Sequence, residues 1–436
     1  MAAGLGTRMK SAKPKHLHPL LGRPLVAWVV DAVHAAGPSP LVLVASPESA
    51  AELAAAFPNV EVAVQEEPRG TGDAVAAARQ ALEGFEGDLL VLAGDSPLLT
   101  PEAINQLVDE HRREGAAVTL LSIEPEGHRP FGRILRDEKG DLAAIVEERD
   151  ATPEQLELRE LNASVYVFAA PDLWEALGEL ETDNAQGELY LTDTIARLAQ
   201  AGKRAVVYRS PDPDVAEGVN TRVDLALAAS HLRKRILTAH MLAGVTVVDP
   251  DTTWVEADVE IDPDVVIQPF TILRGRTVVR REAEIGPHVV AIDAEIGQGS
   301  TVGPFCYLRP GSVLGAGAKA GTFVEIKNAQ IGERSKVPHL SYIGDAEIGE
   351  DTNIGAGAIT ANYREERYPE KQRTVIGSNV HTGSQNVFVP PVEIGDDAWT
   401  GAGSAITEDV PKGALAVARA RQVNKEGYDD ARQRND

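Results

Sequence analysis

The feature that most constrains this fold is an aliphatic residue that returns every six positions between residues 255 and 406. With interruptions, the repeat occupies Val255, Ile261, Ile267, Leu273, Val279, Ile285, Ile296, Val302, Leu308, Leu314, Ala320, Ile326, Ile331, Val337, Ile343, Ile348, Ile354, Ile376, Phe388, Ile394 and Ile406. A helix of 3.6 residues per turn cannot keep a period of six on one face. A coil of short strands can, because each inward side chain stacks on its copy in the next coil, roughly 4.8 Å away. Hexapeptide spacing, here often with a glycine after the repeated residue, indicates a parallel β-helix.

The charge balance limits the partners that such a chain binds. Its 436 residues include 66 acidic and 42 basic side chains, a formal net charge of −24. This balance argues against nucleic acid or an anionic membrane as a general partner. The length predicts two or three domains.

The sequence also favours a cytoplasmic protein. It has no run of about 18 apolar residues and no charged-then-apolar leader, so we expect neither a membrane span nor a secretory signal. The single cysteine, Cys306, suits a reducing compartment and is expected to be a small buried residue rather than a reactive thiol.

The N-terminal half alternates helix and strand patterns. Helices are expected at residues 24–36, 47–57, 71–82 and 101–114, and strands at residues 41–45, 60–64 and 88–93. Such alternation predicts a mostly parallel sheet with helices on both faces and ligands beyond the carboxyl ends of its strands. Residues 222–242 carry an apolar stripe, end near Gly244 and are expected to form a helix that connects the two halves.

One loop of this half suits phosphate. The run Ala2-Ala-Gly-Leu-Gly-Thr-Arg-Met9 is glycine-rich, so its backbone amides can approach phosphate oxygens, and Arg8 and Lys15 add positive charge.

Two further loops follow predicted strands. Asp95 is either a helix cap or an oxygen ligand of Mg²⁺, which prefers carboxylates together with substrate phosphates. Gln65 and the Gly70-Thr-Gly72 turn either shape the backbone or form hydrogen bonds to a base or sugar.

A second group of polar residues lies between positions of the hexapeptide repeat. It contains Arg309, Lys327, His339, Tyr342, Asn353, Asn362 and Tyr363. Each alone is most simply a solvated side chain, but together they suit one reaction. Arginine and lysine bind a sugar phosphate, and a neutral histidine accepts a proton near pH 7. Residues 361–374 interrupt the repeat and form an insertion, which is either a tolerated surface loop or part of a binding face.

Taken together, these segments resemble the bifunctional N-acetylglucosamine-1-phosphate uridylyltransferase / glucosamine-1-phosphate acetyltransferase family. The N-terminal matches are Ala2 to Met9, Pro14-Lys15, Gln65, Gly70-Thr-Gly72, Gly94-Asp95, Phe131-Gly-Arg133, Val146-Glu147, Asn162, Gln186-Gly-Glu188, Leu191-Thr-Asp193 and Glu217-Gly-Val-Asn220. The C-terminal matches are Leu308-Arg-Pro-Gly311, Val324 to Asn328, His339-Leu-Ser-Tyr342, Asn353 to Gly357, Ala361-Asn-Tyr363 and Lys425-Glu-Gly427. The likeness spans nearly the whole chain.

The resemblance implies an N-terminal site at which N-acetylglucosamine 1-phosphate attacks UTP and expels pyrophosphate. Asp95 and Asn220 would bind Mg²⁺, and Arg8 and Lys15 would act as catalytic cations on the triphosphate. The residues implied for binding UTP and the UDP-sugar are Ala2, Ala3, Gly4, Lys15, Gln65, Gly70, Thr71, Gly132, Glu147, Asn162 and Asn220.

The resemblance implies a C-terminal site that transfers the acetyl group of acetyl-CoA to glucosamine 1-phosphate. His339 would be the general base. The sugar phosphate would be bound by Arg309, Lys327, Tyr342, Asn353 and Lys371, and the coenzyme by Ala356, Asn362, Tyr363, Ser384, Ala402 and Arg419. The family also implies a left-handed β-helix, a homotrimer with sites between subunits, and a role in supplying precursors for peptidoglycan and lipopolysaccharide.

The expected architecture is therefore α/β plus all-β. A Rossmann-like nucleotidyltransferase domain would span residues 1–221, a linker helix residues 222–244, and a left-handed β-helix domain with a C-terminal tail residues 245–436.

One departure from the family concerns the first strand. The family carries a short apolar strand immediately before the Ala-Ala-Gly loop, where this sequence starts at Met1. Without it, we expect neighbouring strands to show unpaired backbone groups and an open apolar face.

Two alternatives use the same residues differently. The chain could be a sugar-1-phosphate nucleotidyltransferase alone, with the β-helix serving oligomerisation or regulation, or a scaffold without catalysis. The joint occurrence of Arg309, Lys327, His339 and Tyr342 favours the bifunctional enzyme, which makes UDP-N-acetylglucosamine.

Overall fold

The computed structural model describes residues 1–436 except 5, 128, 130, 139, 364–370 and 427–436. The chain divides into two compact units, Met1–Leu232 and Arg233–Asp436. The boundary falls inside α8 (Arg222–Leu242), the helix predicted to connect the two halves. The finer domain limits at residues 221 and 244 stay a prediction.

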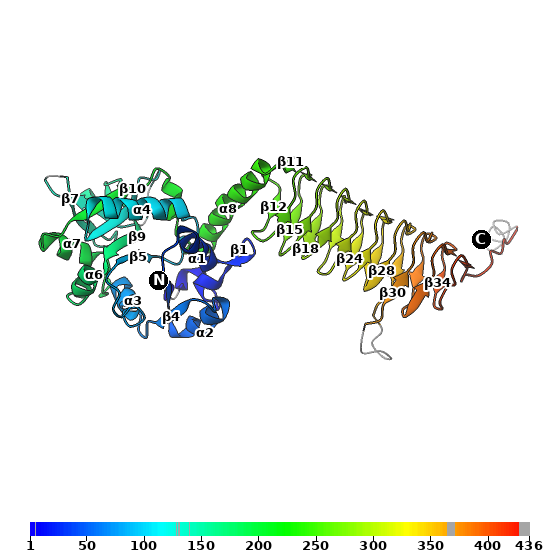
Figure 1. Ribbon diagram of the computed structural model, residues 1–436, viewed down its shortest axis with the longest axis horizontal. Coiled ribbons are helices and arrows are strands. Elements are labelled where there is room, and N and C mark those ends of the chain that lie inside the picture. Colours follow the sequence, from blue (N-terminus) through cyan, green and yellow to red (C-terminus); the bar gives the residue numbers. More distant parts are fainter. Residues whose placement is uncertain (5, 128, 130, 139, 364–370, 427–436) are drawn as a thin grey trace, which may run out of the picture. The chain divides into compact units, whose positions relative to one another are not determined.

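The N-terminal unit packs helices around a mixed sheet (Figure 1). Its helices are α1 (Leu25–Ala36), α2 (Pro47–Ala56), α3 (Thr71–Ala77), α4 (Pro101–Glu114), α5 (Pro153–Leu156), α6 (Ala170–Leu177) and α7 (Asp193–Gln200), with 3-10 turns η1 (Thr7–Met9), η2 (Lys15–Leu17) and η3 (Pro213–Ala216). Its strands are β1 (Pro19–Leu20), β2 (Arg23–Pro24), β3 (Val42–Ala45), β4 (Glu61–Val64), β5 (Asp88–Leu92), β6 (Val118–Ile123), β7 (Arg133–Arg136), β8 (Leu142–Val146), β9 (Leu161–Ala169) and β10 (Ala205–Arg209).

The largest sheet of this unit is not mostly parallel. Its order is β10-β6-β9-β7-β8, with β5 also paired to β9. β10 runs parallel to β6, but β9 runs antiparallel to β5, β6 and β7. The expectation of a mostly parallel sheet is wrong here, because β7 and β8 form an antiparallel hairpin and β9 returns against them.

Most of the expected helices and strands of this half are present. α1, α2 and α4 match the predictions closely, as do β3, β4 and β5. α3 is shorter than expected and ends at Ala77, because the amides of Ala78 and Arg79 bond to carbonyls three residues back. Such bonds form turns rather than α-helix.

The expected open face between strands is present beside Met1. β3 pairs with β4 and β5 pairs with β9, and within the described residues no strand pairs with their facing edges. Among the described residues, Met1 and Ala2 bridge the gap: the Met1 ammonium donates to Leu92 O at 2.7 Å, and Ala2 N donates to Val44 O at 2.6 Å. A cavity of about 830 Å³, lined largely by aliphatic residues of α1, β3 and β5, separates β3 from β5 beneath α1. We call it the β3–β5 slot.

The C-terminal unit is a stack of parallel coils (Figure 1). One sheet contains β11 (Thr246–Val247), β14 (Val266–Ile267), β17 (Glu284–Ile285), β20 (Thr301–Val302), β23 (Lys319–Thr322) and β26 (Lys336–His339). A second contains β12 (Trp254–Val255), β15 (Ile272–Arg274), β18 (Val290–Ile292), β21 (Tyr307–Leu308), β24 (Glu325–Lys327), β27 (Tyr342–Gly344), β29 (Ile359–Thr360), β31 (Val387–Phe388) and β34 (Ala405–Ile406). A third contains β13 (Glu260–Ile261), β16 (Val278–Val279), β19 (Glu295–Ile296), β22 (Val313–Leu314), β25 (Gln330–Ile331), β28 (Ala346–Ile348), β30 (Thr374–Ile376) and β32 (Val392–Ile394), while β33 (Trp399–Thr400) pairs with β35 (Leu415–Ala416).

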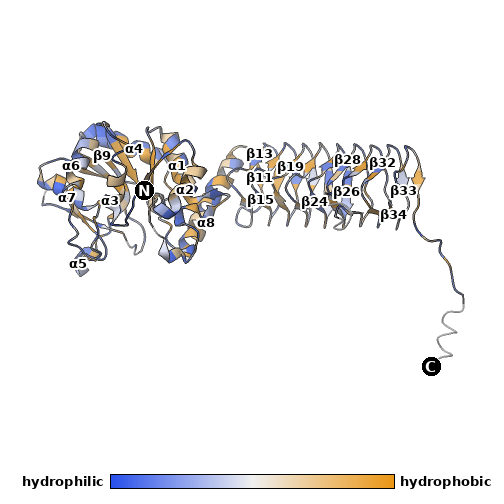
Figure 2. Cartoon of the chain, turned by 90° about the horizontal axis from the view of Figure 1, so that it is seen from below, coloured by the Kyte–Doolittle hydropathy of each residue, from blue (hydrophilic) through white to orange (hydrophobic). Residues whose placement is uncertain are grey.

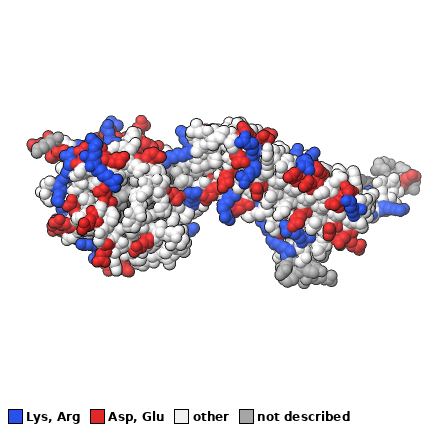
Figure 3. Space-filling view, in the orientation of Figure 1, with Lys and Arg blue, Asp and Glu red and all other residues white. Residues whose placement is uncertain are grey.

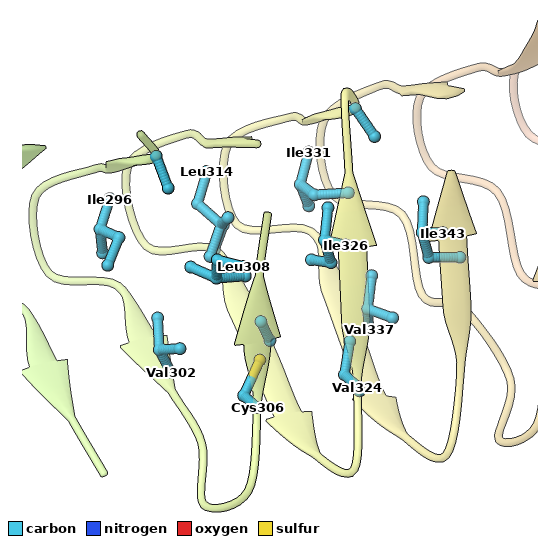
Figure 4. Packing of buried hydrophobic residues seen from close by; sticks show 14 of the residues in the cluster. Ile296, Val302, Cys306, Leu308, Leu314, Val324, Ile326, Ile331, Val337 and Ile343 are labelled. Carbon is cyan, nitrogen blue, oxygen red and sulfur yellow. The ribbon is translucent and has the colours of Figure 1, made fainter. Parts of the chain in front are cut away.

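Successive coils pair in parallel register, so the predicted left-handed parallel β-helix is confirmed. Figure 4 shows the repeated side chains, among them Ile296, Leu308 and Ile326, pointing into the coil. The first slip in the repeat is explained by Ala291, which is buried and stacks between Leu273 and Leu308. The repeat therefore continues through Ala291, and the next repeated residue, Ile296, follows after five positions instead of six.

Cys306 is buried in this stack, as expected, and burial raises the pKa of its thiol to about 12. A thiol of this kind stays protonated and packs as a small apolar residue.

The surface and the interior differ in character along the whole stack. Apolar residues run through the strands of every coil (Figure 2). Outside, basic and acidic side chains are interspersed over the visible face of both units (Figure 3). No helix in the described part of the chain has both the length and the apolar run that a membrane crossing requires.

Candidate active sites

The N-terminal candidate site is centred on the ammonium of Lys15, at the start of η2. Its Nζ forms an ion pair with Asp95, which follows β5, and donates to Asn220 Oδ1 at 3.3 Å. Arg8 donates to the same Asn220 oxygen at 2.9 Å. Gly6 permits this packing, because a Cβ there would lie 2.6 Å from the Cβ of Lys15. Four residues predicted to act together are therefore in contact.

The charge of Lys15 governs the protonation of Asp95. Burial alone would raise the pKa of this carboxyl, but the Lys15 ammonium and its hydrogen bond hold the pKa below the ordinary value. Asp95 is therefore a carboxylate at neutral pH, which is the form that binds cations.

The oxygens of Asp95 and Asn220 fit a Mg²⁺ ion. Both lie against one cation, the Lys15 ammonium, so they converge on a single point. A carboxylate and an amide oxygen are ligand types that Mg²⁺ accepts, and the ion usually takes its remaining ligands from water and phosphate. The described residues contain no group of three or more His, Cys, Asp or Glu arranged to hold a metal.

Sequence reasoning missed His16, which is buried beside this cluster. Burial, followed by the charge of Lys15, lowers the pKa of His16 to about 3, so its imidazole is neutral. The only sequence signal for His16 was its position directly after Lys15, the predicted phosphate-binding lysine.

Gln65 and the Gly70-Thr71 turn form the second part of this site. Gln65 Nε2 donates to Gly70 O at 3.1 Å and to Asp73 Oδ2 at 2.8 Å. Gly70 has φ 116°, and a Cβ there would lie 2.5 Å from Leu189 O. Thr71 Oγ1 accepts a hydrogen bond from Leu191 N at 2.9 Å. The turn is thus shaped by Gln65 and held against residues 189–191.

Gly132, Glu147 and Asn162 also come together. Asn162 N donates to Gly132 O at 2.9 Å, and a Cβ on Gly132 would lie 3.6 Å from both carboxylate oxygens of Glu147. Thr192 donates to Glu147 Oε1 at 3.1 Å. Burial, more than neighbouring Asp193, raises the pKa of Glu147. Of the opening loop, Ala2 and Ala3 are buried and Gly4 is exposed.

In the C-terminal unit, His339 belongs to a column of candidate residues that share one register. Gly357 N donates to His339 O, Gln385 N to Ala356 O and Gly403 N to Ser384 O, at 3.1, 2.7 and 2.8 Å. These bonds place His339, Ala356, Ser384 and Ala402 one above another along one corner of the coil. Arg419 lies beside the top of this column, since its Cδ would be 3.8 Å from a Cβ on Gly403.

Arg309, Lys327 and Lys371 form a basic cluster on the face that follows this corner. The Arg309 amide donates to Ile326 O at 2.8 Å, which places Arg309 beside Lys327 on the next coil. Lys371 lowers the pKa of Lys327 by a hydrogen bond and by its charge, and Arg309 adds to the effect. Glu325 pairs with Arg309 at 2.8 Å and neutralises only part of this charge.

Tyr342 and Asn362 border the basic cluster. Asn362 Nδ2 donates to Tyr342 Oη at 3.3 Å and to Asp345, while Tyr363 is exposed next to it. Gly344 leaves room for both, because a Cβ there would lie 2.5 Å from Tyr342 Oη.

Asn353 does not lie on this face. It pairs with Lys336 below and His381 above, on the face that precedes the corner, whereas Tyr342 pairs with Glu325 on the face that follows it. Residues 364–370 of the insertion and Gly427 of the Lys425-Glu-Gly427 match lie outside the described residues.

Comparisons with known proteins agree with the resemblance noted for the N-terminal half and for the whole chain. Residues 1–191 match the family model described as a MobA-like NTP transferase domain. Curated relatives named "Bifunctional protein GlmU" align over nearly the full length. Those of Mycolicibacterium gilvum and Streptomyces coelicolor are 47% identical over 98% of this chain and 90% and 92% of their own. That of Thermoanaerobacter pseudethanolicus is 43% identical over 98% of this chain and 96% of its own. The chain therefore belongs to the bifunctional GlmU family, the uridylyltransferase and acetyltransferase family that its motifs resemble.

Proposed function

We propose that this bifunctional enzyme makes UDP-N-acetylglucosamine in two steps. The C-terminal unit transfers the acetyl group of acetyl-CoA to the amine of glucosamine 1-phosphate. The N-terminal unit then transfers a uridylyl group from UTP to N-acetylglucosamine 1-phosphate and releases pyrophosphate. The observation that carries the first step is the basic cluster of Arg309, Lys327 and Lys371 beside Tyr342, because adjacent like charges are stabilised by a bound anion such as a sugar phosphate.

In the acetyl transfer, His339 is the general base. It accepts a proton from the ammonium of glucosamine 1-phosphate, and the freed nitrogen forms a bond to the thioester carbon. The carbon–sulfur bond then breaks, a further proton passes from the nitrogen to the departing sulfur, and coenzyme A leaves as the thiol. A positioned base of this kind contributes about 10²- to 10⁴-fold in rate. Arg309, Lys327, Tyr342, Asn353 and Lys371 bind the sugar phosphate.

The coenzyme lies along the column above His339. Ala356, Ser384 and Ala402 present short side chains there, so an extended chain can pass close to the backbone. The remaining coenzyme-binding residues of the proposal are Asn362, Tyr363 and Arg419.

In the uridylyl transfer, positioning and charge neutralisation do most of the work. An oxygen of the sugar phosphate bonds to the α-phosphorus of UTP, and the bond to pyrophosphate breaks. Bound Mg²⁺, held by Asp95 and Asn220, supplies positive charge to the phosphates. Arg8 and Lys15 neutralise the triphosphate. Backbone groups of Ala2, Ala3 and Gly4 approach the nucleotide.

The base and the sugar have separate binding residues. Gln65, Gly70 and Thr71 bind uracil. Gly132, Glu147 and Asn162 bind the sugar, for which the carboxyl of Glu147 offers hydrogen-bond acceptors.

The acetyl-transfer site also supports a homotrimer with sites between subunits. Asn353 and Tyr342 lie on adjacent outer faces of the β-helix, on successive coils and on either side of a convex corner. Side chains on such faces diverge, so one chain cannot close them around one sugar phosphate. A neighbouring subunit would supply the missing face.

The test is conversion by the purified full chain of glucosamine 1-phosphate, acetyl-CoA and UTP. We expect free coenzyme A, pyrophosphate and UDP-N-acetylglucosamine. Pyrophosphate release from UTP and N-acetylglucosamine 1-phosphate without any acetylation would leave only the nucleotidyltransferase function, with the β-helix in another role.

A further inference from the structure

The N-terminal unit buries one guanidinium that the proposed reaction does not use, that of Arg133. Arg133 is the first residue of β7, is 2% exposed and is among the largest fully buried side chains of the described residues. In the described part of the chain no carboxylate pairs with it, and its Nε has no hydrogen-bond partner. A buried charge without an ion-pair partner costs free energy. Packing alone therefore gives no reason for arginine at this position.

The guanidinium holds two carbonyls of the loop that leads into β7. Arg133 Nη1 donates to Arg129 O at 3.2 Å and also donates to Phe131 O. Both oxygens precede Gly132, one of the residues assigned to sugar binding. The side chain thus closes this loop onto the strand that follows it.

The bond to Phe131 O controls the direction of the Gly132 amide. The two groups belong to the same peptide unit, which is trans. In a trans peptide the C=O and the N–H point in opposite directions, and because the unit is planar they turn together. Gly132 lacks a Cβ and so restricts this rotation little. By holding the Phe131 oxygen, Arg133 therefore fixes where the Gly132 N–H points.

This amide lies where the other sugar-binding residues meet. β7 pairs antiparallel with β8 along one edge and with β9 along the other, and Arg133 is paired in both ladders. The preceding residue, Gly132, therefore lies opposite Glu147 on one side and Asn162 on the other. An amide N–H beside a carboxylate offers a donor and an acceptor, which is the combination that a sugar hydroxyl uses.

We propose that Arg133 is a positioning residue for uridylyl transfer, which aims the Gly132 amide at N-acetylglucosamine 1-phosphate. This inference rests on the proposed sugar-binding role of Gly132, Glu147 and Asn162. It adds a residue that does not itself contact the sugar but determines how one of its donors is presented.

The test is Arg133→Met in the full chain, which keeps the length of the side chain and removes its hydrogen bonds. Replacing a buried charge by an apolar side chain of similar volume is often neutral for stability. Arg129 and Phe131 are half-buried, so water can replace the guanidinium at their carbonyls. We therefore expect the melting temperature to change little. The KM for N-acetylglucosamine 1-phosphate should rise about tenfold, as for the loss of one well-placed hydrogen bond, while the KM for UTP and the rate of acetyl transfer stay unchanged.

The matched control is Arg136→Met in the same strand. Arg136 is exposed and its guanidinium pairs with Glu160 at 2.8 Å, away from the loop carbonyls. This variant should keep both KM values of uridylyl transfer.

A second variant, Arg133→Lys, keeps the charge but replaces the planar fork with a single ammonium. Its KM for the sugar phosphate should lie between those of the unsubstituted chain and Arg133→Met. If Arg133→Met does not fold, Arg133→Lys decides, with a severalfold rise in that KM and an unchanged KM for UTP.

Two results would overturn the inference while leaving the proposed function intact. One is a folded Arg133→Met, or in its absence a folded Arg133→Lys, with an unchanged KM for N-acetylglucosamine 1-phosphate. The other is a variant whose melting temperature falls while both KM values rise together, because Arg133 would then only stabilise the unit. By contrast, an unsubstituted chain that releases no pyrophosphate from UTP and N-acetylglucosamine 1-phosphate contradicts the proposed function itself.

Discussion

Lys371, which lies within the 361–374 insertion, is a neighbour of Lys327 in β24, and the hydrogen bond and charge of Lys371 lower the pKa of Lys327. A hydrogen bond between the two side chains needs one amine uncharged, because an ammonium group only donates. When both are charged they repel one another, and a phosphate between them removes that repulsion. The position of Lys371 therefore makes the described C-terminal end of the insertion part of the candidate binding face.

The first prediction concerns this pair. Lys371→Met should raise the KM for glucosamine 1-phosphate about 10- to 100-fold, the usual loss for one hydrogen bond to a charged group. The KM for acetyl-CoA should change far less. Steady-state kinetics of acetyl transfer measures both, with Lys319→Met, an exposed lysine of β23, as the control. A larger change for acetyl-CoA than for the sugar phosphate would move Lys371 out of the phosphate site.

The same pair predicts a pH dependence. A lysine binds phosphate in its charged form, which is lost as pH rises through its pKa. Because the pKa of Lys327 is lowered, affinity for glucosamine 1-phosphate should begin to fall at a lower pH than an ordinary lysine gives. Lys371→Met should shift that fall to higher pH. Calorimetric titration across alkaline pH measures the shift, and an unchanged profile would contradict the coupling.

The third prediction concerns Glu147. Its folded-state pKa is raised, mainly by burial, so the folded protein loses stability as pH rises from the unfolded pKa through the folded one. Glu147→Gln should therefore raise the melting temperature at neutral pH, with the gain vanishing in acid. It should also raise the KM for N-acetylglucosamine 1-phosphate about tenfold, through the loss of a charged acceptor. If the gain in melting temperature over the unsubstituted chain is no larger at pH 7 than at pH 4, the prediction is contradicted.

The fourth prediction uses two glycines with positive φ. Gly70→Ala places a Cβ 2.5 Å from Leu189 O, whereas Gly84→Ala meets nothing within 4 Å. Both variants carry the cost of left-handed backbone, about 1–2 kcal/mol. Only Gly70→Ala should also displace the turn beside Gln65 and raise the KM for UTP at least tenfold. Equal KM values for the two variants would separate this turn from nucleotide binding.

The fifth prediction concerns the β3–β5 slot. Met1 and Ala2 already bond to both strand edges in the parallel pattern, so four apolar residues such as Val-Ile-Val-Leu, fused before Met1, should continue that strand. Such a strand pairs backbone groups along both edges and fills apolar space. We expect a higher melting temperature of the N-terminal unit and faster uridylyl transfer. A Gly-Ser-Gly-Ser extension is the control, and an equal effect of the two would contradict strand insertion.

Much of this architecture follows from the sequence, because the hexapeptide period excludes a helix and the alternating apolar patterns of the N-terminal half mark its helices and strands. Other features could not be predicted from the sequence, for physical reasons. Ala291 is hard to assign to the repeat, because the next repeated residue, Ile296, follows five positions later rather than six, although Ala291 fills the core as its larger neighbours do. The direction of β9 depends on a hairpin before it rather than on its own residues.

The candidate sites show the same division. The motifs identified Asp95, Asn220 and Lys15 as partners, and the structure brings them into contact. The motifs could not show that Asn353 and Tyr342 occupy different faces, since that depends on where each falls relative to a corner. The exposed row of Phe270, His288, Phe305, Phe323 and Leu340 went unnoticed because these residues are seventeen or eighteen positions apart and lie between positions of the repeat.

The central claim, that the two units catalyse successive steps at separate sites, is tested most directly by a pair of single substitutions. Each variant receives glucosamine 1-phosphate, acetyl-CoA and UTP, and both half-reactions are followed in the same mixture. His339→Ala should lose acetyl transfer about 10²- to 10⁴-fold yet form UDP-N-acetylglucosamine at the normal rate once N-acetylglucosamine 1-phosphate is added. Asp95→Ala should acetylate normally and accumulate that intermediate. Normal acetylation by His339→Ala, or normal pyrophosphate release by Asp95→Ala, would contradict the account.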